Sequence, residues 1–317
     1  MKLVTFRSEQ GPRLGALIND DRTILDLQAA HVRRNGSASP ALASMQALID
    51  AQALPVAQAL AADVQADEGV PLRTSGHLLA PLPRPLQLRD TLSFIGHLQG
   101  AMAAAEKLGA PRSPMLEHLV SIFHTRPFWY NANHLCVSGP DTIVYWPAYS
   151  KIIDYELEMA VVIGRGGRDI KADRAREHIF GYSIFNDFSA RDTQSVEMPT
   201  GMGVQKSKGF DGANGLGPCI VTADEFDPYD ATMSVWINGE KISENTSATI
   251  THRFETTIEW LSMHETLYPG EIFCSGTVGG GCGVESGRFL QPGDTIELEI
   301  SGIGRLRHFI DRLPNEH

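Results

Sequence analysis

The clearest alternation of polar and apolar positions lies in the segment DYELEMAVVIG, residues 154 to 164. In an extended strand, side chains two positions apart share a face, so the carboxylates of Asp154, Glu156 and Glu158 line one side and apolar residues line the other. The acidic face then continues as alanine, valine and glycine, which predicts that the far end of the strand is buried on both faces. A half-buried strand whose acidic side faces water is the alternative. Carboxylates crowded beside an apolar wall have raised pKa values or share a cation, and the shared cation is our working hypothesis.

The remaining pattern predicts an α+β protein dominated by strands. Residues 1–27 have the short apolar runs and turn residues of a β-meander, and residues 41–66 have helical spacing of Leu, Met and Val. Three prolines in residues 80–88 interrupt both patterns. We therefore predict a small β-rich N-terminal domain with a helical segment over residues 1–80 and a larger domain over residues 85–317. The predicted helices of the larger domain cover residues 89–111, ended by Gly109 and Pro111, and residues 172–180 and 255–264, and short strands begin at Val137.

Composition and charge exclude several classes of partner. The chain has 317 residues, of which 42% are hydrophobic and 21% charged, so it can bury a large core. Its net charge of −11 argues against nucleic acid or an anionic membrane surface as the main partner. The N-terminus lacks a signal-peptide core, no apolar run is long enough to span a membrane, and the four cysteines lack paired metal-ligand spacing. We expect a cytoplasmic protein whose cysteines pack in the core.

Other segments contain further candidates for a functional site. Asp187 follows an apolar run, at a strand end where functional side chains collect, although a turn is the alternative. Asp192 fits a capping box of the next helical turn. Lys208 lies in the Gly-rich segment SKGFDGANGLGPC, which lacks the residue order of a phosphate-binding loop. The segment CSGTVGGGCGVES contains Thr277 and Glu285 and, on composition alone, is a loop.

Several segments resemble, in the same order, those of the fumarylacetoacetate hydrolase family. These segments are DYELEMAVVIG, GYSIFNDFSARDTQ, KGFDGANGLGP, FCSGTVGGG and LQPGDTIELEISGIG. The resemblance covers the chain from about residue 85 to the C-terminus and is weaker before it. It implies that the larger domain is a mixed β-roll of the type found in this family, preceded by the smaller domain.

The resemblance also implies a divalent-cation site. The family binds its cation through an E-x-E pair and a later Asp, which match Glu156, Glu158 and Asp187, and through a further Asp, which matches Asp90. Four carboxylates without sulfur or imidazole suit Mg²⁺ or Mn²⁺, with Ca²⁺ as a third candidate, rather than Zn²⁺ or copper. Asp154 is not a ligand by the family pattern, and we interpret it as a charge at the entry of the strand.

The family hydrolyses carbon–carbon bonds of acylpyruvates and related 1,3-dicarbonyls, and the resemblance implies such a reaction in the catabolism of aromatic compounds. His97 lies seven residues after Asp90, the spacing of the family's general base, although a lone His in a helical stretch is otherwise structural. By resemblance, Glu285 orients His97, and Lys208 holds the negative charge that develops. The positions that match polar substrate contacts are Tyr130, Gln194 and Thr277.

Three positions depart from the pattern of the fumarylacetoacetate hydrolases proper. Leu92 and Met198 replace tyrosines, and Glu106 lies where the family has a carboxylate-binding Arg. A planar guanidinium holds a carboxylate in a way that Glu cannot, so the change argues against fumarylacetoacetate itself as the substrate. Arg112 or Lys107 is a candidate replacement for that Arg.

Other activities remain open on the same scaffold. Relatives of this type include isomerases, decarboxylases and hydratases of related 2-oxo acids, and a non-catalytic metal-binding protein is a further alternative. The pair of His97 and Glu285 favours hydrolysis, and the presence of Lys208 favours an enzyme. We therefore expect an anionic diketo-acid substrate and, by resemblance, a homodimer.

Overall fold

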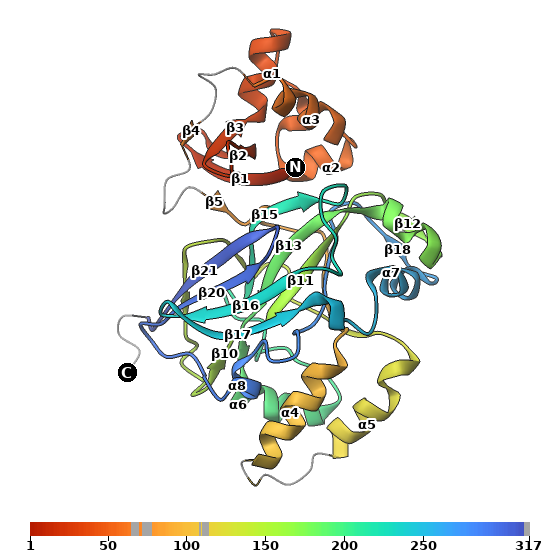
Figure 1. Ribbon diagram of the computed structural model, residues 1–317, viewed down its shortest axis with the longest axis vertical. Coiled ribbons are helices and arrows are strands. Elements are labelled where there is room, and N and C mark those ends of the chain that lie inside the picture. Colours follow the sequence, from red (N-terminus) through yellow and green to blue (C-terminus); the bar gives the residue numbers. More distant parts are fainter. Residues whose placement is uncertain (65–69, 72–77, 108, 110–113, 314–317) are drawn as a thin grey trace.

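Two β-sheets packed face to face form the centre of the molecule (Figure 1). The computed structural model describes residues 1–64, 70–71, 78–107, 109 and 114–313. The larger sheet is mixed and has 12 strands in the described part of the chain, with the path β4-β3-β2-β1-β15-β13-β11-β19-β6-β7, β5 beside β1 and β8 beside β15. The smaller sheet has the order β17-β16-β20-β21-β9. The predicted combination of helices and a strand-dominated core is confirmed.

The strands of the larger sheet are Lys2–Ser8 (β1), Gly11–Ile18 (β2), Thr23–Asp26 (β3), Val70–Pro71 (β4), Leu78–Leu79 (β5), Leu88–Leu92 (β6), Phe128–Asn131 (β7), Val137–Ser138 (β8), Leu157–Ile163 (β11), Ile179–Asp187 (β13), Asn214–Thr222 (β15) and Ile272–Cys274 (β19). Those of the smaller sheet are Thr142–Tyr145 (β9), Thr232–Ile237 (β16), Glu240–Thr246 (β17), Thr295–Ile300 (β20) and Gly304–Asp311 (β21). Two short pairs join Ile153–Asp154 (β10) to Ser189–Ala190 (β14) and Gly167–Arg168 (β12) to Thr266–Leu267 (β18).

The α-helices are Leu27–Asn35 (α1), Met45–Asp50 (α2), Leu54–Ala62 (α3), Ile95–Lys107 (α4), Pro114–Ile122 (α5), Arg191–Glu197 (α6), Phe254–Ser262 (α7) and Gly283–Ser286 (α8). Short 3₁₀ turns cover Pro40–Leu42 (η1), Phe123–Thr125 (η2), Ala172–His178 (η3), Met198–Thr200 (η4) and Ser247–Thr249 (η5). Helices α1, α2 and α3 lie at the N-terminal end of the molecule, and α4 and α5 lie at the opposite end (Figure 1).

Strand β11 is buried along its whole length, as the sequence predicts. Its run of β-branched residues without Gly or Pro favours an extended, fully covered strand. Leu157, Met159 and Val161 pack into the core between the two sheets, whereas Ala160 and Val162 pack into the core that the N-terminal helices cover. Because side chains alternate along the strand, the glutamates before Ala160 share its face of the sheet.

The N-terminal residues form the predicted β-meander β1-β2-β3, and β1 pairs with β15 of the larger sheet. The described part of the predicted helical segment, residues 41–64, contains the separate helices α2 and α3, because Gln52 adopts a left-handed φ of 51° and Pro55 lies in the first turn of α3. Helix α1 was not predicted, although Asp26 caps it through the Ala29 N–H at 2.9 Å. The division at residues 80–85 stays an interpretation.

The prediction of a helix over residues 89–111 is wrong at its start. Residues 88–92 form β6, which pairs in parallel with β19 and antiparallel with β7, and helix α4 begins only at Ile95. Residues 88–92 form a strand because they pair with segments far along the chain. The local sequence pattern contains no information about such pairing. Helix α4 ends at Lys107, and Pro111 lies outside the described residues. Of the other predicted helices, 255–264 corresponds to α7, whereas 172–180 contains the 3₁₀ turns of η3.

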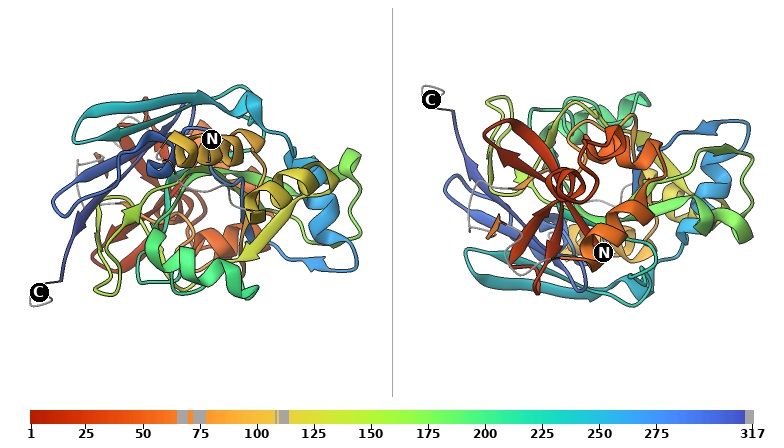
Figure 2. Two further views of the ribbon diagram at one scale, coloured as in Figure 1. Left: turned by 90° about the horizontal axis from the view of Figure 1, so that it is seen from below. Right: turned by 90° about the horizontal axis from the view of Figure 1, so that it is seen from above.

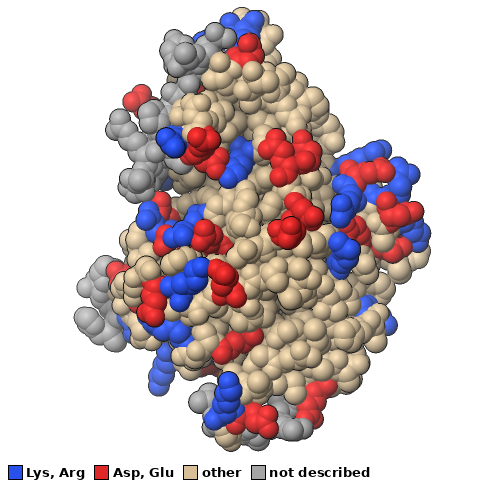
Figure 3. All heavy atoms as spheres, in the orientation of Figure 1, with Lys and Arg blue, Asp and Glu red and all other residues tan. Residues whose placement is uncertain are grey.

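Acidic and basic side chains are interspersed over the face drawn in Figure 3, without a broad basic patch. No helix in the described part of the chain combines the length and the apolar character that a membrane span requires.

Candidate active site

Four carboxylates, three from strands of the larger sheet and one from the residue before β11, meet in the interior of the protein. Asp90 lies on β6, Glu158 on β11 and Asp187 at the end of β13, while Glu156 precedes β11 in an isolated bridge. All four residues are at most 5% exposed. One oxygen atom from each lies within 4.8 Å of the others. The structure thus brings together all four predicted metal ligands, which we call the carboxylate cluster.

Two cations partly neutralise this cluster. The Lys208 ammonium donates to Glu156 Oε2 at 2.7 Å and also to Asp187. The Arg191 guanidinium forms ion pairs with Asp154 Oδ2 at 2.7 Å and with Glu156 Oε1 at 2.6 Å. Lys208 and Arg191 therefore face five buried carboxylates, the cluster plus Asp154, and two of the five, Asp90 and Glu158, have no Lys or Arg partner among these ion pairs.

Three carboxylate oxygens of the cluster fit a shared cation. Asp90 Oδ1, Glu158 Oε1 and Asp187 Oδ1 are buried and lack a hydrogen-bond partner among the described residues. Burial raises the pKa of all three carboxyls, and the neighbouring carboxylates raise that of Glu158 further. Burial acts in the same direction on Glu156, but the two cations reverse its effect and keep the pKa of this carboxyl low. Unpaired buried charge is costly, so an oxygen-only set of this kind suits a divalent cation such as Mg²⁺, Mn²⁺ or Ca²⁺.

His97 and Glu285 form a hydrogen-bonded pair, which we call the dyad. His97 Nδ1 lies 2.7 Å from Glu285 Oε1, and Glu285 Oε2 accepts the Gly280 N–H at 2.7 Å. The side chains of His97 and Glu285 are 14% and 6% exposed. A Cβ atom at Gly100 would lie 2.0 Å from Glu285 Oε2, so Gly at that position lets helix α4 approach this carboxylate without moving it. With Nδ1–H donated to Glu285, Nε2 is the ring atom that can accept a proton.

Backbone contacts join the dyad to the carboxylate cluster. Glu156 and Cys282 form an isolated antiparallel bridge, and Cys282 lies three residues before Glu285. The Gly283 and Val284 N–H groups donate to the Asp154 carboxylate at 2.7 and 3.1 Å. The start of α8, which carries Glu285, is therefore fixed against the segment between β10 and β11 that contains Glu156. Helices α4 and α6 lie at this end of the molecule (Figure 2, left).

The structure contradicts the interpretation of Asp154 as a strand-entry charge. Asp154 is fully buried, and besides the α8 N–H groups it accepts hydrogen bonds from Tyr155 N at 2.8 Å and Arg191 Nε at 2.8 Å. Burial raises the pKa of its carboxyl, and the Arg191 guanidinium opposes this effect. Asp154 is a positioning residue that connects Arg191, Glu156 and the loop that carries Glu285.

The three predicted substrate contacts surround the carboxylate cluster. The Tyr130 hydroxyl donates to Asp187 Oδ2 at 2.8 Å. Gln194, on α6, accepts from Arg191 Nη1 at 2.9 Å. Thr277 is 2% exposed and follows Gly276, whose N–H donates to Glu158 at 3.0 Å. Their contact with a substrate stays a prediction.

Residues 105–311 match the profile of the fumarylacetoacetate (FAA) hydrolase C-terminal domain, which is more than half of the chain. The chain belongs to the fumarylacetoacetate hydrolase family. Asp90 and His97 precede the matched segment, so the structure, rather than the match, brings them to the carboxylate cluster and to Glu285.

Relatives in the fumarylacetoacetate hydrolase family differ in activity. The chain is 27% identical over 311 residues to the mitochondrial oxaloacetate tautomerase fahd2 of Xenopus laevis, which covers 96% of this chain and 89% of that protein. It superimposes on the fumarylacetoacetate hydrolase EaFAH of psychrophilic Exiguobacterium antarcticum with a TM-score of 0.73 at 26% identity, over 98% of this chain and 99% of that chain. Maleylpyruvate hydrolase from Sphingobium sp. SYK-6, solved with manganese(II) ion and pyruvate, gives a TM-score of 0.71 over 98% of this chain and 99% of that chain; at 23% identity this likeness shows the fold alone. The predicted fumarylacetoacetate hydrolase-type fold is confirmed, whereas family membership does not select between hydrolase and tautomerase.

Sequence reasoning missed two features of this family member's site. Arg191 neutralises part of the carboxylate cluster, and the number of acids on neighbouring strands was a signal that a further cation is needed. Gly100 creates space for Glu285, but nothing in the local sequence reveals a contact between residues so far apart.

The capping box predicted for Asp192 is wrong. Ala190 precedes α6 and makes no side-chain cap. Asp192 instead accepts hydrogen bonds from the Ser150 hydroxyl at 2.5 Å and from the Lys151 N–H at 2.7 Å, so it fixes the loop before β10.

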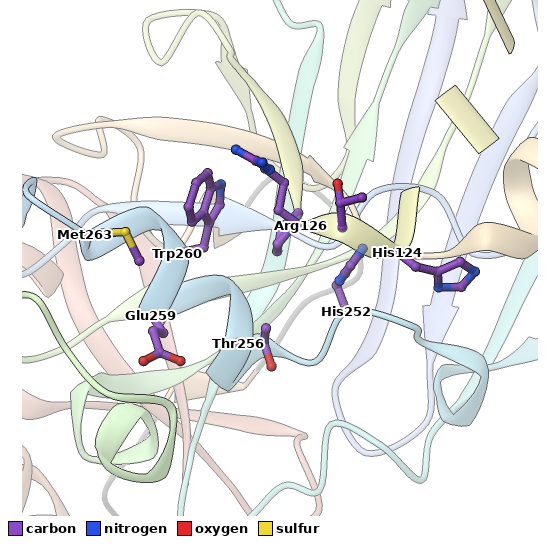
Figure 4. A pocket seen from close by; sticks show the side chains of 9 residues that line it. His124, Arg126, His252, Thr256, Glu259, Trp260 and Met263 are labelled. Atoms are coloured by element: carbon purple, nitrogen blue, oxygen red, sulfur yellow. The ribbon is translucent and has the colours of Figure 1, made fainter. Parts of the chain in front are cut away.

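A surface pocket of about 200 Å³ lies between η2 and α7 (Figure 4). The Arg126 guanidinium lies 5.0 Å from the centre of the Trp260 ring. None of the ten predicted site residues lines this pocket, so we do not include it in the candidate active site, which consists of the carboxylate cluster and the dyad. The pocket is lined by His124, Thr125, Arg126, Pro127, His252, Thr256, Glu259, Trp260 and Met263.

Proposed function

We propose that this protein is a divalent-metal-dependent hydrolase that cleaves a carbon–carbon bond of an acylpyruvate-like or other 1,3-diketo acid in the catabolism of aromatic compounds. The observation that carries the proposal is the 2.7 Å hydrogen bond between His97 Nδ1 and Glu285 Oε1. Hydrolysis needs a base that takes a proton from water, and this geometry leaves His97 Nε2 for that role. The bridge between Glu156 and Cys282 connects this base to the carboxylate cluster.

The residues that would hold the cation are Asp90, Glu156, Glu158 and Asp187. The observations that support this assignment are the unpartnered, buried oxygens of Asp90, Glu158 and Asp187 and the position of a Glu156 oxygen within 4.8 Å of the other three carboxylates. A divalent cation bound there, Mg²⁺ or Mn²⁺ in our proposal, supplies Lewis-acid polarisation of the carbonyl under attack and of the departing enolate.

The side chains of the protein would move the proton and hold the charge. His97 takes a proton from water at Nε2, and Glu285 stabilises the resulting imidazolium through Nδ1–H. The hydroxide adds to the acyl carbonyl, the carbon–carbon bond breaks, and the imidazolium returns its proton to the carbon of the departing enolate. Burial alone would lower the pKa of Lys208, but the carboxylates of Asp187 and Glu156 raise it, so the side chain is an ammonium that can hold developing negative charge.

The substrate is proposed to be anionic and to contact Tyr130, Gln194 and Thr277. Glu106 is exposed near the end of α4, and its anionic carboxylate cannot supply the cationic clamp of a dicarboxylate site. Arg112, a candidate for that clamp, lies outside the described residues. We also propose a homodimer, since β7, β9 and β17 are edge strands without a further described strand beside them.

A tautomerase is the second candidate, because the likeness to the Xenopus laevis oxaloacetate tautomerase extends over 96% of the chain. In this alternative, the same base moves a proton between carbon and oxygen of a 2-oxo acid and no water attacks. The two activities require the same cation and the same His97, but they yield different products.

A substrate panel separates these candidates. The protein is incubated with acylpyruvates and with oxaloacetate, with Mn²⁺ or with EDTA, while the enol absorbance is followed and the products are identified by NMR. The hydrolase proposal predicts equal amounts of pyruvate and a carboxylic acid, formed only with the cation. Interconversion of the keto and enol forms of oxaloacetate, with every acylpyruvate intact, would favour the tautomerase.

A further inference from the structure

Cys282 adds a sulfur atom to the dyad. Its Sγ lies 3.4 Å from Glu285 Oε1 and 3.9 Å from His97 Nδ1. Sulfur, imidazole and carboxylate together are the ligands that Zn²⁺ prefers, in contrast to the oxygen-only carboxylate cluster. We propose that His97, Cys282 and Glu285 form a second metal site, selective for a thiophilic divalent cation such as Zn²⁺, and that its occupation inhibits the enzyme.

The three donor atoms are already spaced almost as a tetrahedral ion requires. Bond lengths of about 2.0–2.3 Å place the donors of a tetrahedral zinc ion about 3.3–3.5 Å apart. The two distances from Cys282 Sγ lie within about 0.4 Å of that range. Only the contact of 2.7 Å between His97 and Glu285 has to open, by about 0.6 Å. Small side-chain movements therefore create the site.

The surroundings of Cys282 favour a fixed ligand rather than a reactive thiol. The residue is fully buried, and its backbone pairs with Glu156. Burial raises the pKa of the Cys282 thiol, so it is protonated without a metal, and binding of the ion releases its proton to solvent. The His97 side chain is 14% exposed and offers an approach for the ion. Among the described residues, the carboxylate cluster is the only other group of this kind, and it contains no cysteine.

Occupation of this site changes the tautomer of His97. A metal ion on Nδ1 uses the lone pair of that nitrogen, so the remaining ring proton moves through solvent to Nε2. Nε2 is then a donor and can no longer take a proton from water. The inhibitory effect rests on the hydrolytic role proposed for His97, whereas binding of the ion does not.

Cobalt(II) provides a spectroscopic test that needs no activity. The protein is titrated with Co²⁺ in an excess of Mg²⁺, which fills the carboxylate cluster. We expect a thiolate-to-cobalt charge-transfer band that Zn²⁺ abolishes by displacement. Cys282→Ala and the milder Cys282→Ser should lose the band. Cys219→Ala, at another buried cysteine, should retain it. A wild type without the band, or a band that persists in both Cys282 variants, overturns the second site.

Inhibition is measured separately on the same proteins. In excess Mg²⁺, Zn²⁺ should slow the wild type and Cys219→Ala, while Cys282→Ala should need at least a tenfold higher Zn²⁺ concentration for the same inhibition. A cobalt band that depends on Cys282, together with full activity in Zn²⁺, would support the site and overturn its inhibitory role. If no substrate in the panel is cleaved, the proposed hydrolase fails while the cobalt result for the site still stands.

Discussion

Replacement of Asp154 by Asn tests whether this residue holds the two parts of the site together. One carboxylate oxygen accepts the Tyr155 and Gly283 N–H groups at 2.8 and 2.7 Å. The other accepts the Val284 N–H at 3.1 Å and the Arg191 guanidinium at 2.8 Å. Asn has nearly the same shape, but one of its positions is an NH₂ group. Whichever way the amide turns, a pair of buried donors then faces another donor.

The expected loss of stability follows from these contacts. A hydrogen bond to a charged group contributes about 1.5–3 kcal/mol, and removal of one partner of a buried ion pair costs about 3–5 kcal/mol. These values describe overlapping contacts and do not add. We therefore expect Asp154→Asn to lower the free energy of unfolding by about 3–5 kcal/mol, a large part of the ~5–15 kcal/mol typical of a folded protein.

Urea unfolding of the wild type and the variant measures this difference. Asp173→Asn is the matched control, because Asp173 is exposed on η3 and its replacement should change stability by no more than about 0.5 kcal/mol. A loss below about 1 kcal/mol for Asp154→Asn would contradict the role of Asp154 as a connecting residue, because replacement of an isolated charge at the strand entry would cost no more than that.

Three further predictions concern the metal, the dyad and the fold. Glu158→Ala should lower Mn²⁺ affinity and activity together, with activity partly restored at high Mn²⁺; unchanged affinity by calorimetry would remove Glu158 from the ligand set. Gly100→Ala places a methyl group 2.0 Å from Glu285 Oε2, so the rate should fall by about 10²-fold while Mn²⁺ affinity stays the same. A wild-type rate in this variant would show that helix α4 can move away from Glu285 without loss of activity. Burial lowers the pKa of His308 to about 3, below its usual 6.5, so the unfolded chain binds the proton first, and stability is complete above pH 6.5 and is lost as the pH falls toward 3. His308→Gln should therefore lose less stability than the wild type between pH 7 and pH 4 in urea unfolding. Equal losses would show that protonation of His308 does not cause the loss of stability at acid pH.

The alternation in residues 154–164 predicted the shared face of two site residues. Glu156 and Glu158 alternate with apolar residues, so their shared face follows from strand geometry, and β11 is buried as the pattern indicated. The local pattern predicts a helix at Asp90, whereas the structure has strand β6 there. This strand forms because β6 pairs with β19 and β7, which connects residues more than 30 positions apart. Local periodicity contains no information about such pairing.

The supporting contacts were less predictable than the ligands. Asp154 has the spacing of the E-x-E pair, yet only its contacts with Arg191 and the start of α8 show that it is a buried positioning residue. In the sequence, Gly100 is indistinguishable from an ordinary glycine in a helix. Its role in leaving space for a carboxylate depends on the position of Glu285 in the folded chain. His97 and Glu285 are 188 residues apart, and their pairing was expected from the family resemblance rather than from any local pattern.

The most direct test of the central claim compares proton transfer with metal binding in one variant. His97→Ala is assayed with an acylpyruvate that the wild type cleaves, and its Mn²⁺ affinity is measured by calorimetry on the same preparation. We expect nearly unchanged Mn²⁺ affinity, because the proposed ligands are carboxylates, and a rate lower by roughly 10²–10⁴-fold, the range for loss of a positioned acid–base group. A variant that hydrolyses the acylpyruvate as fast as the wild type would contradict the assignment of His97 as the base.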